Sequence, residues 1–150
     1  MAQDLLIQQQ DGGFDLVIGE QDFKTVDGME TTIAVLLFTD ARAAPEEVPD
    51  PEKRRGWVGN ILRSTELGGM MWLMTQTRNT QEVRTRIVKW VKSSLQPLLD
   101  DSIATEIQVN VNKVSSRGIN LSINIIVKNG ESTKYNYWLD TNLGNLTDAN

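Results

Sequence analysis

Residues 80–99 have the sequence TQEVRTRIVKWVKSSLQPLL, the most regular stretch of the chain. Its apolar positions recur at helical spacing on one stripe, formed by Val83, Ile87, Trp90-Val91, Ser94-Leu95 and Leu98. The basic side chains lie off that stripe. Asn79 or Thr80 can cap the helix, and Asn79 with Glu82 fits a capping box. Pro97 should end or kink it. The stretch predicts a long amphipathic helix with one face to bury.

Three segments after this helix alternate apolar and polar residues with the period of a β-strand. They span residues 107–111, 119–127 and 133–139, and Asn129-Gly130, a strong hairpin signal, joins the last two. One apolar and one polar face are typical of an antiparallel sheet covered on one side. Leaving sheet face or helix stripe in water would cost roughly 25 cal/mol per Å². The sequence therefore predicts an α+β fold in which an antiparallel β-meander packs against the long helix.

Two further elements are predicted near the N-terminus. Apolar runs at 5–7 and 14–18 flank Asp11-Gly12-Gly13 and predict a β-hairpin. Asp27 followed by Glu30 resembles a capping box. The apolar spacing after it predicts a second, buried helix of about three turns that ends near residues 39–40. Its β-branched residues mildly favour a strand instead.

Residues 53–74 connect the acidic N-terminal part to the long helix. They hold two of the four tryptophans and four of the eleven glycines, so we expect a folded connector at a packing junction. Trp72-Leu73 should pack beneath the long helix. Arg54, Arg55 and Trp57 are candidates for an exposed partner interface. The alternative is that the basic triplet at 53–55 pairs with the acidic block inside the fold.

The last predicted strand carries aromatic side chains on both faces. Tyr135 and Tyr137 share one face, and Trp138 takes the other. These three side chains are either buried on both sides of the sheet or candidates for a partner interface, and both alternatives stay open. If the strand is a sheet edge, its free backbone groups could accept a strand from another chain.

Length and composition predict one domain over residues 1–150. Residues 43–52 hold three of the four prolines and should form an exposed loop, and the polar tail at 142–150 should fray. No apolar run approaches the ~20 residues of a membrane span. The chain has no cysteine and no histidine, which removes thiol chemistry and the usual general base and zinc ligand. With no nucleotide-binding or serine-elbow motif present, we expect no catalytic residue, cofactor or metal.

The net charge of −5 hides an asymmetry along the chain. Residues 1–52 carry a net charge of −10, residues 53–92 of +7, and residues 93–150 of −2. Such blocks indicate complementary faces for partners, or pairing with each other inside the fold. The acidic total and the lack of a reading motif disfavour nucleic-acid binding.

The order of these features resembles the Mu-type baseplate proteins of contractile phage tails, over roughly residues 4–127. This family is related to wedge and sheath-initiator proteins once described as lysozyme-like. The residues that carry the resemblance best are Leu37-Phe38-Thr39-Asp40-Ala41-Arg42 and Arg54-Arg55-Gly56-Trp57. Many relatives have Glu-Pro-Arg after the long helix, whereas this chain has Gln96-Pro97-Leu98. A partner contact made through that arginine is therefore not carried over.

The resemblance implies a structural protein of the virion, assembled in the host cytoplasm and present in several copies at the tail baseplate. Its implied partners are other wedge proteins and the tail sheath protein, whose assembly it would help to start, with the tail tube as a further candidate. One alternative is a peptidoglycan hydrolase that uses two carboxylates, for which we considered Glu66, Glu82, Glu106 and Glu131. Another is an adaptor of a non-phage contractile injection system.

Overall fold

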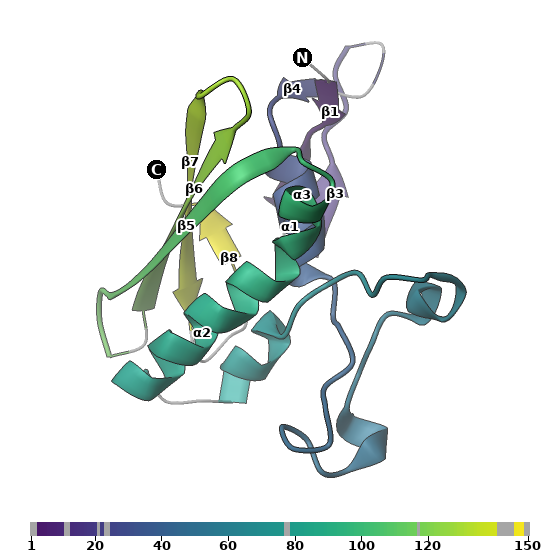
Figure 1. Ribbon diagram of the computed structural model, residues 1–150, viewed down its shortest axis with the longest axis vertical. Helices are drawn as coiled ribbons and strands as arrows, with labels where there is room; N and C mark the ends of the chain where they lie inside the picture. The colour runs from purple at the N-terminus through teal and green to yellow at the C-terminus, as the bar shows by residue number, and fades with distance from the viewer. Residues whose placement is uncertain are drawn as a thin grey trace.

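The computed structural model describes residues 3–10, 13–20, 22, 25–76, 79–116, 118–140 and 146–148 (Figure 1). The fold is α+β, as predicted. A four-stranded antiparallel sheet has the order β5-β6-β7-β8, and helix α2 (Gln81–Ser94) crosses one of its faces. The strands are β5 (Ala104–Lys113), β6 (Gly118–Val127), β7 (Ser132–Asp140) and β8 (Leu146–Asp148). Within the described ranges, no helix is both long and apolar enough to cross a lipid bilayer.

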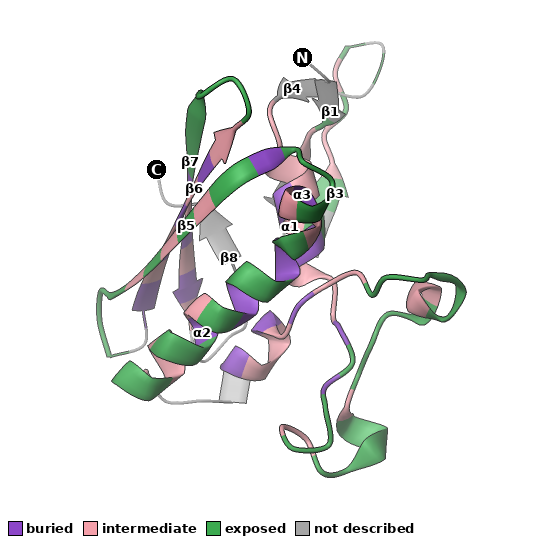
Figure 2. Cartoon of the chain, viewed as in Figure 1, coloured by how far each residue is buried: buried purple, intermediate pink, exposed green. Residues whose placement is uncertain are grey.

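The core lies between α2 and the inner face of the sheet (Figure 2). Four alternating apolar residues of β6 are fully buried on the inner face, and they are Ile119, Leu121, Ile123 and Ile125. Cross-strand pairing sets Tyr135 of β7 opposite Ile123, and Tyr137 opposite Leu121. The predicted stripe of α2 covers this face with Ile87 and Val91. Each such buried side chain stabilises the fold by about 1.5–3 kcal/mol, before its entropy cost.

The ends of α2 follow the sequence prediction, with one choice resolved. Thr80 is the N-cap, and its hydroxyl accepts a hydrogen bond from the Val83 amide at 3.3 Å. Asn79 instead holds the β5–β6 turn, because its amide nitrogen donates to the carbonyl oxygens of Ser115 and Gly118. Pro97 lies in the first turn of a separate short helix, α3 (Gln96–Asp100). The helix therefore ends where the proline predicts.

The N-terminal part forms two small strand pairs and a helix. β2 (Ile7–Gln10) pairs with β3 (Gly13–Leu16), which confirms the hairpin, although its turn at 11–12 lies outside the described residues. β1 (Gln3–Leu5) pairs with β4 (Thr25–Asp27). The predicted second helix is confirmed as α1 (Glu30–Phe38), which buries Ile33, Leu36 and Leu37.

The predicted cap of α1 is wrong. Asp27 belongs to β4, and the N-cap position is Met29, which has no side-chain capping bond. Gly28, at φ +139°, redirects the chain between the strand and the helix. This turn places Asp27 before the cap position, so the capping box cannot form.

The last strand of the meander is only partly a sheet edge. Residues Tyr137–Leu139 of β7 pair with β8, so part of the tail expected to fray is ordered against the sheet. The pairing satisfies backbone groups that an edge would leave open. The rest of the tail lies outside the described residues. The opposite edge of the sheet is β5.

Candidate functional site

Between α1 and α2 the chain makes a long excursion, of which residues 42–67 are called the arm below. The arm forms the two loops at the lower right of Figure 1, and most of its surface is exposed in Figure 2. It contains two short 3-10 helices, η1 (Pro51–Lys53) and η2 (Val58–Leu62), and η3 (Met71–Gln76) follows it. A connection of this length with so little regular structure commonly carries function.

Two glycines close the base of the arm. The Ala41 amide donates to the Gly69 carbonyl at 3.0 Å, and the Gly69 amide donates to the Thr39 carbonyl at 2.9 Å. A Cβ at Gly68 would lie 2.4 Å from the Thr39 oxygen, and one at Gly69 would lie 2.2 Å from Ser94 Oγ on α2. Only glycine permits so close an approach. The end of the connector at residues 68–74 is therefore a packing junction, as predicted, whereas most of residues 53–67 are exposed.

Two arginines tie the loops of the arm together. The guanidinium of Arg42 donates to the carbonyl oxygens of Arg55, at 3.2 Å, and Pro51, at 3.1 Å. The guanidinium of Arg54 donates to the carbonyl oxygens of Val48, at 2.7 Å, and Pro49, at 2.8 Å. The arm is therefore organised around charge-assisted hydrogen bonds. Arg54, expected to face a partner, is half-buried and directed inward.

The segment from 43 to 52 is not uniformly exposed. Ala43 is buried, and its amide donates to the Arg54 carbonyl at 2.9 Å. Glu47 attaches this loop to α2: its carboxylate accepts from Trp90 Nε1 at 3.3 Å and lies 3.7 Å from Arg86 Nη2. The prolines at 45 and 49 are exposed, whereas Ala43 and Glu47 anchor the loop.

Opposite charges of the N-terminal block and the basic segment meet within the chain. Arg55 pairs with Asp40 at 3.1 Å, and Lys53 pairs with Asp50 at 3.4 Å. Arg55 also lies over the Trp72 ring, 5.0 Å from its centroid. Such exposed pairs contribute about 0–1 kcal/mol each. Internal pairing, one of the two alternatives raised by the charge blocks, thus accounts for part of the asymmetry.

The packing of η3 agrees only in part with the expectation for Trp72-Leu73, since Leu73 packs against the core cluster while Trp72 is not part of it. Met71 and Met74 are the buried members of η3, while Trp72 and Leu73 are half-buried. Trp72 Nε1 donates to the Ala41 carbonyl at 3.0 Å, so its ring packs at the base of the arm and under Arg55. The longer, unbranched methionines reach the core because η3 presents them toward α2.

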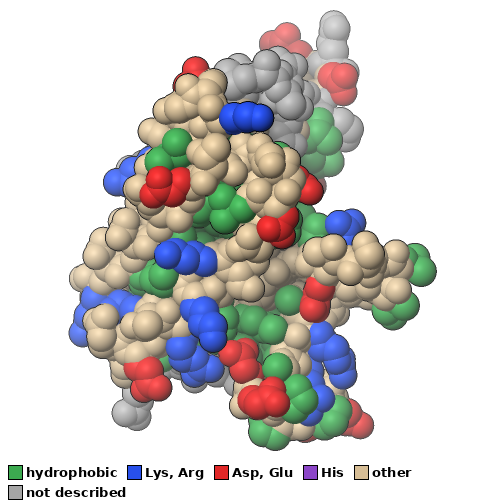
Figure 3. All heavy atoms as spheres, viewed as in Figure 1, with side chains coloured by type: hydrophobic (Ala, Val, Ile, Leu, Met, Phe, Trp, Pro, Cys, Tyr) green, Lys and Arg blue, Asp and Glu red, His purple; other side chains and the backbone are tan. Residues whose placement is uncertain are grey.

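The tip of the arm exposes large apolar side chains. The exposed fraction is 44% for Trp57, 75% for Val58, 81% for Ile61 and 92% for Leu62. Hydrophobic side chains are visible at the outer end of the right-hand loop in Figure 3. The backbone beneath is fixed by Asn60, whose side chain both donates to the carbonyl and accepts from the amide of Leu67, each at 2.9 Å. We call these four apolar residues the tip.

Sequence reasoning singled out only Trp57 of the tip. The apolar spacing 58, 61, 62 is that of one helical face, but no neighbouring stripe in the sequence matched it. That unmatched face was the signal that could have identified the other three residues.

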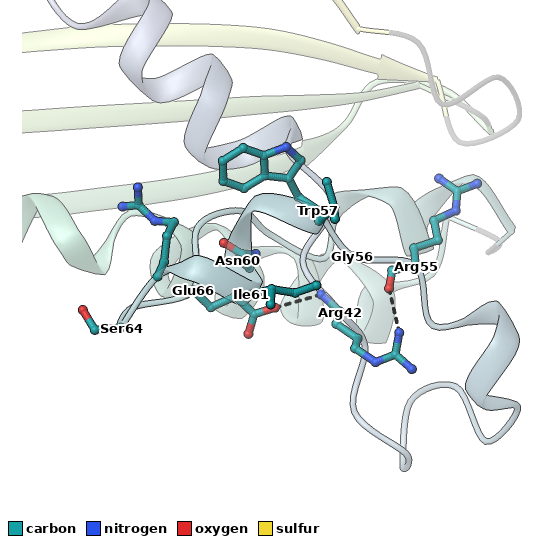
Figure 4. Close-up of a pocket in the computed structure, with 10 residues that line it drawn as sticks. Arg42, Arg55, Gly56, Trp57, Asn60, Ile61, Ser64 and Glu66 are labelled. Atoms are coloured by element: carbon teal, nitrogen blue, oxygen red, sulfur yellow. Dashed lines mark hydrogen bonds between the residues drawn. The ribbon is translucent and has the colours of Figure 1, made fainter.

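A cleft of about 420 Å³ lies beside the tip (Figure 4). Its charged lining consists of Arg42, Arg55, Arg63 and Glu66, and its apolar lining includes Trp57, Val58 and Ile61. Glu66 Oε1 accepts the Arg42 amide at 3.0 Å, while the side chain of Arg55 extends away from the other labelled side chains toward Asp40. The cleft therefore has an excess of positive charge next to apolar surface.

The aromatic residues of β7 divide between two environments. Tyr135 and Tyr137 are buried in the core, which favours the core alternative for both. The Tyr135 hydroxyl accepts the Met29 amide at 3.3 Å, and burial raises the pKa of this tyrosine. Tyr137 packs edge-on against Phe38, with ring centroids 5.8 Å apart. Trp138, on the other face of the sheet, is half-buried beside Gly118.

Metal-ligating side chains do not gather in groups of three or more anywhere in the described ranges. The candidate site therefore consists of the tip and the cleft beside it, with Trp138 on a different surface. This arrangement provides an apolar and cationic contact surface.

Comparison with known proteins agrees with the resemblance found in the sequence. Over 136 residues the chain is 26% identical to the baseplate protein gp46 of Escherichia phage Mu, covering 89% of this chain and 94% of that protein. It is 25% identical over 130 residues to the Mu-like prophage FluMu protein gp46 of Haemophilus influenzae, and this match covers 86% of this chain and 90% of that protein. The family model described as phage protein GP46 matches residues 29–132, which include both the arm and most of the sheet. The chain therefore belongs to the phage protein GP46 family.

Proposed function

We propose that this chain is a structural component of a phage tail baseplate and that it binds neighbouring baseplate proteins through the tip of its arm. The observation that carries the proposal is the tip itself, where Val58, Ile61 and Leu62 are each at least 75% exposed on a backbone held in place. The name of the relative from Escherichia phage Mu supplies the setting.

An exposed apolar cluster of this kind fits a protein interface better than a free surface. Clustered apolar side chains in water have an unfavourable hydration free energy, which burial against a partner removes. Interfaces concentrate their binding energy in a few large anchors surrounded by polar groups. The hydrogen bonds of Arg42, Arg54 and Asn60 fix the shape of the arm beforehand, so less conformational entropy is lost on binding.

The finer assignment follows from the resemblance. The partners are wedge proteins and the tail sheath protein, whose polymerisation this chain helps to start, and several copies surround the tail of the virion, where the tail tube is a further candidate partner. Of the predicted interface residues, Trp57 lies at the tip, Arg55 lies at the base of the arm, and Trp138 offers a second surface. Arg54, Tyr135 and Tyr137 support these surfaces from inside.

The hydrolase alternative gains no support from the four glutamates considered for it. A general acid of that class sits in an apolar pocket opposite a second carboxylate. Glu66, Glu82, Glu106 and Glu131 are all exposed to solvent. A turbidity assay on purified cell walls tests this alternative directly, and we expect no clearing.

Deletion of the gene from the virus that encodes it, followed by electron microscopy of the particles, tests the proposal. We expect tails without an assembled baseplate and sheath, restored by the full chain supplied in trans. A chain with Ile61→Ser and Leu62→Ser should restore assembly poorly, while Val114→Ser, at a 60% exposed apolar position in the β5–β6 turn, should restore it fully. Normal contractile tails in the absence of the gene would refute the proposed function.

A further inference from the structure

We infer that the cleft beside the tip binds an acidic, apolar segment of a different baseplate protein: a carboxylate side chain flanked by a bulky apolar one. This inference rests on the proposed function and specifies the partner chemistry of the same site. The juxtaposition that carries it is a cationic wall and an apolar wall within one cleft of about 420 Å³.

One arginine of the cationic wall, Arg63, has both terminal nitrogens uncommitted among the residues that the structure describes. Arg42 donates from both of its terminal nitrogens to carbonyl oxygens, and Arg55 donates from Nη1 to Asp40 and lies over the Trp72 ring. Arg63 uses only Nε, which donates to the Thr65 carbonyl at 3.3 Å. Within the described ranges its two terminal nitrogens have no acceptor. They can take a carboxylate in a bidentate pair, the geometry for which a guanidinium is preorganised.

The single acid of the cleft does not neutralise this wall. Glu66 is one acid against the three arginines of the lining, of which Arg55 already pairs with Asp40, and one Glu66 oxygen already accepts the Arg42 amide. Asp50 pairs with Lys53 and Glu47 pairs with Arg86, and within the described ranges no ion pair joins an acid to Arg63. A carboxylate that complements Arg63 can therefore come from a partner chain.

The apolar wall is continuous with the tip. Val58 and Ile61 line the cleft and are also exposed beyond it. The Trp57 ring lies against Gly59 of η2, where a Cβ would be 2.3 Å from the ring. Gly59 thus lets the indole pack as one side of the cleft. An aliphatic or aromatic side chain next to the bound carboxylate would be buried between Trp57 and Ile61.

Photocrosslinking in assembled particles tests the inference. Ser64 lines the cleft, is exposed, and is not an anchor, so benzoylphenylalanine can replace it in the full chain without removing a proposed contact. After irradiation of purified tails, we expect mass spectrometry to find a crosslink to a different protein, at a segment with Asp or Glu next to an aliphatic or aromatic residue. A crosslink to a second copy of this chain, to nucleic acid or to a segment without acids overturns the inference, as does no crosslink from a chain that is present in the tails.

Charge reversal is the second experiment that tests the inference. Arg63→Glu should reduce recovery of the chain in purified tails on the order of tenfold, the effect typical of losing one central contact. Lys89→Glu, an equally exposed cation on α2, should leave recovery unchanged. Reversing the acid in the crosslinked segment to lysine should restore the Arg63→Glu chain. If Arg63→Glu is recovered like the parent chain, the inference fails while the proposed function stands; if the parent chain itself is absent from tails, the proposed function fails.

Discussion

In the sheet and its covering helix, Leu121, Ile123 and Val91 are fully buried among apolar side chains, whereas the loops of the arm are tied together by the guanidinium groups of Arg42 and Arg54. The large apolar side chains of the tip are exposed, although Ala43 is buried and Leu67 packs against the core. An apolar core stabilises a region by hiding its apolar surface. A region held by guanidinium–carbonyl bonds keeps its shape while its apolar side chains stay available. The difference associates stability with the sheet and helix and, under the proposed function, recognition with the arm.

Truncating one apolar side chain in each region should give the largest difference in the free energy of unfolding. Leu121→Ala should lower the free energy of unfolding by about 2–5 kcal/mol, because the side chain is fully buried and leaves a cavity. Leu62→Ala should change it by less than about 0.5 kcal/mol, because 92% of Leu62 is exposed. Urea denaturation measures both. Equal losses would show that the tip packs against the rest of the chain in solution.

The base of the arm should be the next most sensitive point. Gly68→Ala forces a side chain into a conformation with φ +117° and to within 2.4 Å of the Thr39 carbonyl oxygen, so we expect a loss of about 1–3 kcal/mol. Gly130→Ala is the matched control, since Gly130 also has positive φ, +86°, but nothing within 4 Å of its added Cβ. In thermal denaturation, Gly68→Ala should lower the melting temperature more than Gly130→Ala. The reverse order would mean that the arm does not depend on this closure.

The same contrast explains what could be predicted from the sequence. The helix stripe and the strand alternation are periodic, so α2, β5, β6 and β7 follow from local pattern alone. Asn79 and Thr80 are both good caps, and only the position of the β5–β6 turn decides between them. The core positions of Tyr135 and Tyr137 depend on long-range pairing and packing, which no local pattern specifies.

The structure of the arm was the least predictable from the sequence. Its shape depends on Arg42 and Arg54, which donate to carbonyl oxygens five to thirteen residues away. Every residue has a backbone carbonyl oxygen, so the sequence carries no signature of which residue an arginine contacts. The basic triplet indicated an exposed surface, whereas one of its arginines is internal. The residues that we propose for recognition are instead the uncharged ones that follow.

Loss of an internal arginine should open the arm and spare the sheet. Arg54→Gln removes charge-assisted bonds to Val48 and Pro49, so we expect faster hydrogen exchange at the Ala43 amide and faster proteolysis within 43–54. Global unfolding should change by less than about 1 kcal/mol, because the region opens locally. Lys53→Gln, which alters only an exposed pair, is the control. A global loss as large as that of Leu121→Ala would contradict the division between the two regions.

The smallest predicted effect is a pH dependence that belongs to the sheet and not to the arm. Burial, and next in the same direction the charge of Glu30, raise the pKa of Tyr135 above its ordinary value of 10.0, against opposing hydrogen bonds from Met29 and Thr133. The folded chain therefore keeps this proton to higher pH than the unfolded chain. The stabilisation is fully present below pH 10 and is lost as the pH rises from there through the raised pKa.

Tyr135→Phe has no ionisable group at this position, so the loss of stability caused by ionisation of Tyr135 at alkaline pH is absent from the variant. The variant should be less stable at neutral pH, since the hydroxyl that accepts the Met29 amide is gone. Its free energy of unfolding should nevertheless fall less steeply above about pH 10 than that of the parent chain. Urea titrations at several alkaline pH values compare the two slopes. Because Tyr137 and all lysines are present in both chains, parallel slopes would mean that Tyr135 ionises as easily in the folded chain as in water.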